Sequence, residues 1–485
     1  MRCPHAWMLL LGLVLVACNT GGAVDADARG DAAHPDAHDA SPDAPAPDVV
    51  VDASADAPRP DTAPDATPDA VADPGADLSP DAGDAGNDAP DYSHVPILER
   101  PAEVTVTCTK LHDAVPLADT WAYWMGADLA PAGAEVLLVR GEGNGDVTDV
   151  VASTLALDGT LGPSHTLAHL ATWSYARPRA VEIAGGVAAV YAAGDASPRL
   201  EYVAADVAGS VTAGPLAIAG LSGCSDAAVT TTADGVAVLA VAQSGQGVRF
   251  VALDATGAAK GPAVYLPSKG ENVSYPAPRL LAVDGGFVAA WTEISYGAGG
   301  SQVAAVARLD ASGAVLGGVV RLAPEGHGAS GPAVVAVPGG YLVAWAESYQ
   351  PADWNQSGWS VVMVQRFSSD LAPLGPPARV QDPVDAITCH TPVWIDVAPG
   401  TPALSFDCGV LYNICAGCVP TETLGVIALH PDTLVPASHK VLLKSPGAGG
   451  LLNPRYVRQG NDWYVYADLT YHALSQPSLS ALRCE

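Results

Sequence analysis

The chain has 485 residues and a formal net charge of −30, with 52 Asp and Glu against 22 Lys and Arg. A balance this acidic disfavours nucleic acid as a partner, because phosphates attract basic surfaces. Hydrophobic residues make up 49% of the chain and charged residues only 15%, so we expect a large folded core beside any polar tract.

Residues 1–18 are typical of an export signal. Arg2 follows the amino terminus, and Ala6–Val16 is an apolar run far shorter than the roughly 20 residues of a membrane-spanning helix. The run ends in Leu15-Val16-Ala17-Cys18, which resembles the signal of bacterial lipoproteins. That resemblance implies lipidation of Cys18 after cleavage, and Asn19 then favours the outer membrane or cell surface. The alternative is an ordinary secretory signal with an incidental cysteine.

Residues 19–96 form a tract rich in Asp, Ala and Pro. The tract holds 18 Asp, no Glu and two Arg, a formal charge of −16, which is more than half of the total. Like-charge repulsion, frequent proline and little hydrophobic bulk oppose collapse, so we predict a disordered linker. A calcium-binding repeat array is the weaker alternative, because its Gly-Gly-x-Gly-x-Asp period is absent.

Residues 97–485 carry an internal repeat. Its clearest copies are Arg279–Gly317 and Ala333–Gly375, in which a glycine pair leads into a Val/Ala run that ends in Trp291-Thr292-Glu293 or Trp345-Ala346-Glu347. Short Val/Ala/Leu runs separated by Gly, Asp and Pro predict an all-β domain. Asp/Gly turns such as Leu309-Asp310-Ala311-Ser312-Gly313 supply the acceptor and the positive φ of tight hairpins.

The repeat predicts a β-propeller. Three runs and a fourth after the Asp/Gly turn make a four-stranded unit of roughly 40 to 60 residues, the size of a propeller blade. We count seven blades, of which the last, from Asn453, lacks one strand. Ala102–Cys108 is expected to supply it, so that the two ends of the domain close the ring. A string of β-sandwiches, or a ring of six or eight blades, is the alternative.

The cysteines favour disulfides in an oxidising envelope. Cys108 on the closing strand is expected to bridge to Cys484, and Cys389 to face Cys408 across a hairpin. Cys415 and Cys418 lie together in the next loop, and Cys224 is left without a predicted disulfide partner. A zinc site of Cys408, Cys415, Cys418 and His390 is the alternative, although a second Cys-x-x-Cys is missing.

A binding face is predicted from the aromatic and acidic pairs on the second strand of three blades. The pairs are Trp291 with Glu293, Trp345 with Glu347, and Tyr466 with Asp468; residues two apart on a strand point to one side. The loop Ser348–Ser360 adds Trp354 and Trp359. Such groups suit a glycan, a cationic peptide or calcium. The alternative is that the aromatics pack between blades.

No catalytic motif stands out, since a Gly-x-Ser-x-Gly elbow, a His-Glu-x-x-His helix and a phosphate-binding glycine loop are all missing. We therefore predict a membrane-anchored lipoprotein whose propeller, as a monomer, binds or scaffolds a glycan or protein without an obligatory cofactor. The alternative is a carbohydrate-active hydrolase or lyase that uses Glu293 and Glu347 as its carboxylate pair.

Overall fold

The computed structural model describes residues 104–117, 124–144, 147–170, 177–194, 198–242, 247–268, 272–273, 278–294, 302–322, 328–349, 359–380, 387–398, 401–410, 423–444, 450–471 and 474–485. Some side chains within these ranges also lie outside the description. The described residues belong to one compact unit, Asn87–Glu485. They contain no helix, and so none that could span a bilayer. The predicted signal, Cys18 and the linker lie outside the described residues.

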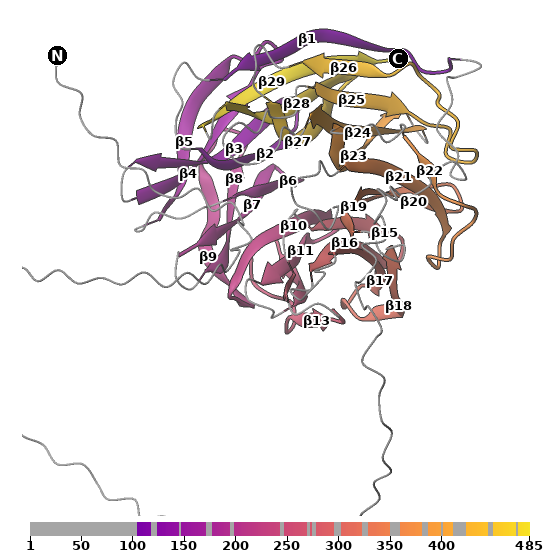
Figure 1. Ribbon diagram of the computed structural model, residues 1–485. Coiled ribbons are helices and arrows are strands. Elements are labelled where there is room, and N and C mark those ends of the chain that lie inside the picture. The colour runs from indigo at the N-terminus through magenta and orange to yellow at the C-terminus, as the bar shows by residue number, and fades with distance from the viewer. Residues whose placement is uncertain are drawn as a thin grey trace, which may run out of the picture. The chain divides into compact units, whose positions relative to one another are not determined.

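The unit is a β-propeller of seven four-stranded antiparallel blades (Figure 1). The first three blades, from the innermost strand outward, are β2 (Trp124–Ala132), β3 (Glu135–Asn144), β4 (Val147–Leu155) and β5 (Leu161–Leu170); β6 (Arg179–Ile183), β7 (Gly186–Ala193), β8 (Arg199–Asp206) and β9 (Val211–Ser222); and β10 (Cys224–Thr232), β11 (Gly235–Ala242), β12 (Val248–Asp254) and β13 (Val264–Leu266).

The next three blades are β15 (Arg279–Val283), β16 (Gly286–Ile294), β17 (Gln302–Asp310) and β18 (Val315–Leu322), with β14 (Asn272–Val273) also paired to β16; β19 (Gly328–Val337), β20 (Gly340–Tyr349), β21 (Trp359–Ser368) and β22 (Ala378–Arg379); and β23 (Ile387–Ala398), β24 (Thr401–Val410), β25 (Thr423–Ala428) and β26 (Val441–Lys444). The last is β27 (Gly450–Gln459), β28 (Asp462–Tyr471), β29 (Leu474–Cys484) and β1 (Cys108–Pro116).

The predicted closure of the ring is confirmed, with one correction to the strand that makes it. The closing strand is β1, Cys108–Pro116, and not Ala102–Cys108. Residues 104–107 precede it as irregular chain, where the amides of Thr105 and Val106 donate to the carbonyl of Ala437. β1 pairs with β29, with Cys108 opposite Cys484, and these two cysteines form a disulfide. The two ends of the described domain are therefore joined in one blade.

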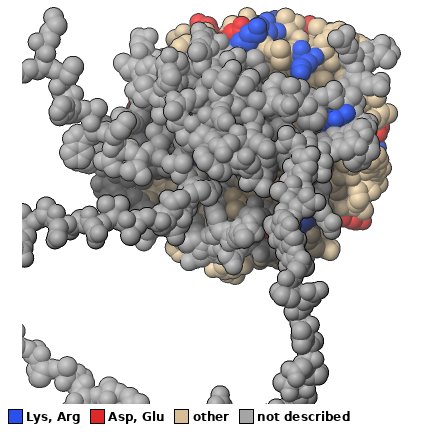
Figure 2. Space-filling model, viewed as in Figure 1, with Lys and Arg blue, Asp and Glu red and all other residues tan. Residues whose placement is uncertain are grey.

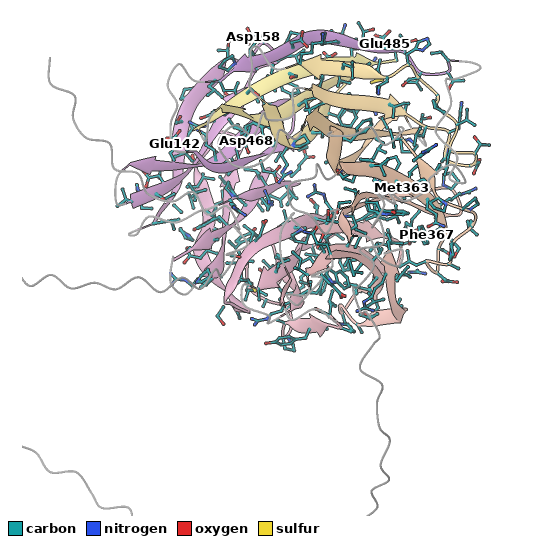
Figure 3. All side chains as sticks on the ribbon, viewed as in Figure 1. Glu142, Asp158, Met363, Phe367, Asp468 and Glu485 are labelled. Atoms are coloured by element: carbon teal, nitrogen blue, oxygen red, sulfur yellow. A yellow bond between two sulfur atoms is a disulfide. The ribbon has the colours of Figure 1, made fainter. Side chains whose placement is uncertain are left out.

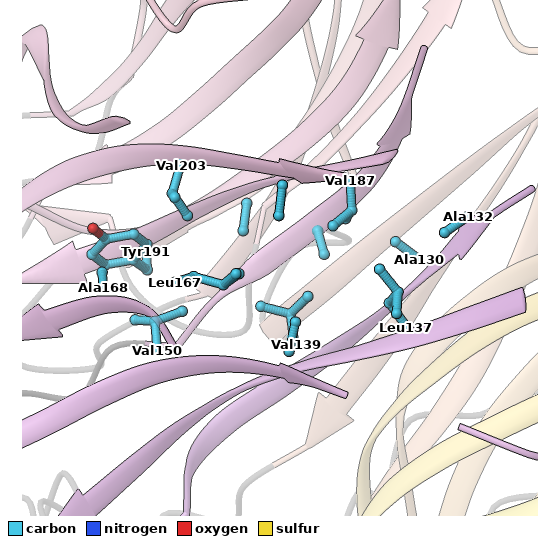
Figure 4. Close-up of a cluster of buried hydrophobic side chains, with 14 of the residues drawn as sticks. Ala130, Ala132, Leu137, Val139, Val150, Leu167, Ala168, Val187, Tyr191 and Val203 are labelled. Atoms are coloured by element: carbon cyan, nitrogen blue, oxygen red, sulfur yellow. The ribbon is translucent and has the colours of Figure 1, made fainter. Parts of the chain in front are cut away.

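Each blade buries both of its faces against its neighbours. The innermost strands contact one another in order around the ring, from β2 through β6, β10, β15, β19, β23 and β27 back to β2. A hydrophobic cluster fills the space between each pair of neighbouring blades. Figure 4 shows the cluster between the β2–β5 and β6–β9 blades, where Val139 and Tyr191 pack. Burial on two faces explains why the strands are continuous Val/Ala runs without polar alternation.

The Asp/Gly turns between the third and fourth strands pack against the preceding blade. At the β17–β18 turn, Asp310 accepts hydrogen bonds from the amides of Ser312 and Ala314 at 2.8 and 3.0 Å. Gly313 follows at φ +88° and sits on the ring of Phe250 in the preceding blade; a Cβ there would lie 2.2 Å from the ring. Gly257 meets Tyr202 in the same way. The turn glycine is thus required by both backbone and neighbour.

Gly313→Ala is expected to destabilise the domain by about 2 to 4 kcal/mol, because left-handed strain adds to overpacking against Phe250. Gly317→Ala is the matched control, since Gly317 also has positive φ (74°) but nothing within 4 Å of its Cβ position. Thermal and urea unfolding of both variants would separate the two terms. Equal losses in the two variants would mean that the contact with Phe250 is not what requires glycine.

The remaining cysteines are only partly described. Cys389 and Cys408 are direct partners in the β23–β24 register, but their side chains, like all of Cys415 and Cys418, lie outside the description, so their disulfides stay predictions. Cys224 is free and buried. Burial raises the pKa of its thiol to about 11, which keeps it in the unreactive protonated form at neutral pH.

Candidate functional site

The predicted pair Trp291 and Glu293 is built into the interior of its blade. Trp291 is only 1% exposed and its indole N–H donates to Oε1 of Glu293 at 3.3 Å. Arg321, on the outer strand β18, grips the same carboxylate with two hydrogen bonds of 2.9 and 3.0 Å. Both oxygens of the carboxylate are therefore hydrogen-bonded within the protein, an arrangement that suits a structural role better than the proton donor of a glycosidase.

Of the other predicted pairs, Tyr466, Trp345 and Glu347 are buried and Asp468 is half-buried. The Tyr466 hydroxyl donates to Asp468, labelled in Figure 3, at 2.6 Å; burial first, and then the charge of Asp468, raise the pKa of Tyr466 far above its ordinary value. Trp345 packs between blades, and its indole N–H has no partner among the described atoms. Glu347 is 3% exposed. These placements agree with aromatics that pack between blades.

The aromatic loop adds little to this picture. Trp354 lies outside the described residues, and Trp359 begins β21 with its side chain outside the description. The ligand-binding role predicted for these residues and for the buried pairs stays a prediction. No group of three or more His, Cys, Asp or Glu that could hold a metal occurs within the described ranges.

A polar cavity of about 190 Å³ lies among the innermost strands at the centre of the ring. Residues from six of the seven blades line it. Its charged members are Asp128 of β2, Arg179 of β6, Arg279 of β15 and Arg455 of β27. Ala228 of β10 and Val393 of β23 complete the lining from the other two blades. Charged groups from distant parts of the sequence thus converge on one small space.

The lining residues occupy equivalent places in their blades. Asp128, Arg179, Ala228, Arg279 and Arg455 each stand four positions before the last residue of the innermost strand. Each of the three arginines directly follows a proline, in Pro178-Arg179, Pro278-Arg279 and Pro454-Arg455. Pro178 and Pro278 directly precede their strands, where proline is tolerated, whereas Pro454 lies within β27. The arginine after each proline lines the central cavity. This repeated Pro-Arg step is the sequence signal for the cavity.

Two of the three arginines have a carboxylate partner. Arg179 Nη2 lies 2.9 and 3.1 Å from the two oxygens of Asp226, and its Nε donates to the Ala227 carbonyl at 3.0 Å. Arg455 Nε lies 3.6 Å from Asp128. Both carboxylates accept backbone amides as well, Asp128 from Ala180 and Asp226 from its neighbour Ala227. These contacts fix the Arg179–Asp226 and Arg455–Asp128 ion pairs at the wall of the central cavity.

Arg279 is different. Its single hydrogen bond among the described residues is a long contact of 3.5 Å from Nη1 to the carbonyl of Pro278, and no described carboxylate lies within ion-pair distance. Burial, followed by the charges of Arg455 and Arg179, lowers the pKa of Arg279 below the usual range of an arginine; Asp128 and Asp226 act weakly in the opposite direction. A half-buried guanidinium whose donors are mostly unused among the described residues therefore lines the cavity.

A second, larger cavity of about 630 Å³ lies where the β2–β5 blade meets the β6–β9 blade. Its lining is mostly small or apolar, including Gly133, Val207 and Gly209, and only Glu135 and His165 bring titratable groups. Convergent polar groups are what distinguish a ligand site from a surface groove. The central cavity is therefore the stronger candidate.

Figure 2 shows part of the described surface of the domain. There, basic and acidic residues lie near one another along the edge of the domain, and the visible described surface carries no broad patch of one sign.

Comparison with known proteins assigns no family to this chain and finds only distant structural likenesses. No family model and no curated protein matches the chain. Among solved structures, the WD40 domain of Toxoplasma gondii coronin is 12% identical at a TM-score of 0.46, covering 80% of this chain and 88% of that one. Polysaccharide lyase Uly1 is 10% identical at 0.45, covering 74% and 89%. The α-L-arabinanase of Penicillium chrysogenum is 12% identical at 0.40, covering 77% and 98%. At these values the likeness carries no argument about ligand or activity.

Proposed function

We propose that this protein is a lipid-anchored ligand-binding module of the cell envelope, held by Cys18 and a long acidic linker, with its ligand site in the central cavity of the propeller. The observation that carries the binding role is the convergence of Asp128, Arg179, Arg279 and Arg455 from four blades on one cavity. Burying charges is unfavourable unless they are paired, and perturbed titratable groups cluster at functional sites.

Two features support binding in preference to catalysis. The acids first considered as a catalytic pair include Glu293, which is held by Arg321 and Trp291. In the central cavity, both carboxylates that meet the arginines are engaged in ion pairs and backbone hydrogen bonds. Neither place offers a free general acid or base beside a nucleophile. Rigid, partnered charges around a small cavity are suited to recognition.

The binding role is tested by a thermal-shift screen of the full chain in detergent against glycans, peptides and small organic acids. A ligand that binds the folded state raises the melting temperature, because it stabilises that state by an amount that grows with the logarithm of its concentration over Kd. A ligand of the central cavity should lose this effect in Ala228→Leu, which fills the cavity, and keep it in Leu316→Gln, a control at a 42% exposed position. Unchanged binding to Ala228→Leu would place the site elsewhere.

The anchor is tested separately with Cys18→Ala. The variant is expected to lose incorporation of a labelled fatty acid and to leave the membrane fraction, because lipid chains on Cys18 would hold the mature protein at the membrane. Fractionation and lipid labelling of the wild type and the variant measure both effects. A variant that stays lipid-labelled in the membrane fraction would refute the anchor and leave the cavity proposal untouched.

A further inference from the structure

We propose that the central cavity binds a small organic carboxylate, and that the Arg279 guanidinium is the group that holds it. This inference rests on the proposed function, because it names the ligand class of the same cavity. Three observations support carboxylate binding: the unused donors of Arg279, the charges around its guanidinium and the size of the cavity.

Arg279 has hydrogen-bond donors that no described residue uses. An arginine carries five N–H donors in a planar fork that matches a carboxylate with two parallel hydrogen bonds. Among the described residues Arg279 uses one donor, in the 3.5 Å contact to Pro278. Arg179, which stands at the same position of its blade, uses Nη2 and Nε on Asp226 and Ala227. Arg279 thus lacks the carboxylate that completes its equivalent, and a ligand can supply one.

The surrounding charges favour an anion at that place. Arg455 and Arg179 act on Arg279 more strongly than Asp128 and Asp226 do, so the neighbours leave a net positive potential at its guanidinium. Asp468 acts on Arg455 and helps to balance that second arginine. The formal charges of the three arginines and of Asp128, Asp226 and Asp468 sum to zero. The excess of positive charge is therefore local to the Arg279 guanidinium. One negative charge next to it would relieve the repulsion.

Size and charge together select the class of anion. A cavity of about 190 Å³ has the volume of about six water molecules and lies below the range of sites for drug-sized ligands. A monoanion matches the one uncompensated guanidinium, whereas a doubly charged phosphate would also face Asp128 and Asp226. Ala228, Leu280 and Val393 in the lining offer contacts to a short apolar group. A small organic acid meets all three conditions.

The test is calorimetric titration of the full chain in detergent with sodium acetate and sodium lactate, with acetamide and lactamide as neutral analogues and inorganic phosphate as the dianionic arm. We expect the carboxylates to bind and their amides not to. Arg279→Met should abolish binding, and Arg279→Lys, which keeps the charge but loses the fork, should weaken it at least tenfold. Arg308→Met is the control, because Arg308 of β17 pairs with the exposed Asp370 and does not line the cavity.

A second readout separates ligand binding from a structural role. Without ligand, Arg279→Met should melt at the same temperature as the wild type or higher, because it removes a half-buried cation that repels two others. A clearly lower melting temperature would instead show that Arg279 supports the fold. Equal carboxylate binding by wild type and Arg279→Met, or phosphate binding in preference to carboxylate, would also overturn the inference. A neutral ligand lost in Ala228→Leu but retained in Arg279→Met would sink the inference and leave the proposed function standing.

Discussion

Removing the disulfide that closes the ring, in Cys108→Ala/Cys484→Ala, is expected to lower the stability of the propeller by about 4 kcal/mol. The bridge joins residues 376 apart in sequence, and the chain-entropy expression gives roughly 6 kcal/mol for a loop of that size. Residual compactness of the unfolded chain reduces this figure. For a domain of this length the loss corresponds to a fall of roughly 5 °C in melting temperature.

The measurement is calorimetric unfolding of the double variant and the wild type, each with and without a reductant. Reductant should lower the melting temperature of the wild type by more than it lowers that of the double variant, because only the wild type has the closing bridge to lose. Cys224→Ala is the control for cysteine loss alone, since Cys224 is free. A double variant that melts with the wild type would show that β1 closes the ring through strand pairing and packing without help from the bridge.

The fold could be predicted because its repeat is written in local signals. Turn glycines such as Gly313 mark the hairpins, and two-sided burial makes runs such as the fully buried β11 uniformly apolar. The closing strand was placed too early because its polar residues do not look like a strand. In β1, Lys110 pairs with Asp113 at 2.8 Å, and His112 bonds the carbonyl of Leu157 at 2.8 Å. On an outermost strand such groups are tolerated at the solvent edge.

For the aromatic and acidic pairs, the spacing along a strand predicts which side of the strand the side chains lie on, but it does not predict their partners on other strands. The spacing of Trp291 and Glu293 correctly put both side chains on one side of β16, where they share a hydrogen bond. It could not show that Arg321 takes the carboxylate. That contact depends on the register of β17 and β18, which shifts between Ala307 and Arg308. A partner set by a bulge two strands away has no local sequence signal.

The central cavity had a signal that hydrophobic periodicity does not detect. Arg179, Arg279 and Arg455 each follow a proline and stand four positions before the last residue of an innermost strand, and a charged residue near a strand end usually indicates exposure. Their convergence follows only from ring closure, which brings the seven innermost strands to one axis. An alignment of the innermost strands on their last residues brings the three arginines together.

Breaking the buried pair at the β16–β18 blade is the second large effect that we expect. Arg321→Met should destabilise the propeller by about 3 to 5 kcal/mol, because Glu293, with 4% of its side chain exposed, would keep a buried charge with only the indole of Trp291 beside it. Glu293→Gln should cost less, since the freed Arg321 is 24% exposed and can turn its charge to water. The asymmetry distinguishes a buried carboxylate that needs its cation from a surface ion pair, whose two halves would cost the same small amount.

Unfolding of the two single variants and of Glu293→Gln/Arg321→Met completes a double-mutant cycle. The double variant should recover much of the loss of Arg321→Met, because a neutral amide is cheaper to bury than a lone carboxylate. Additive single losses would mean that Arg321 acts by packing its aliphatic stem. In that case the carboxylate of Glu293 would be free to serve a ligand.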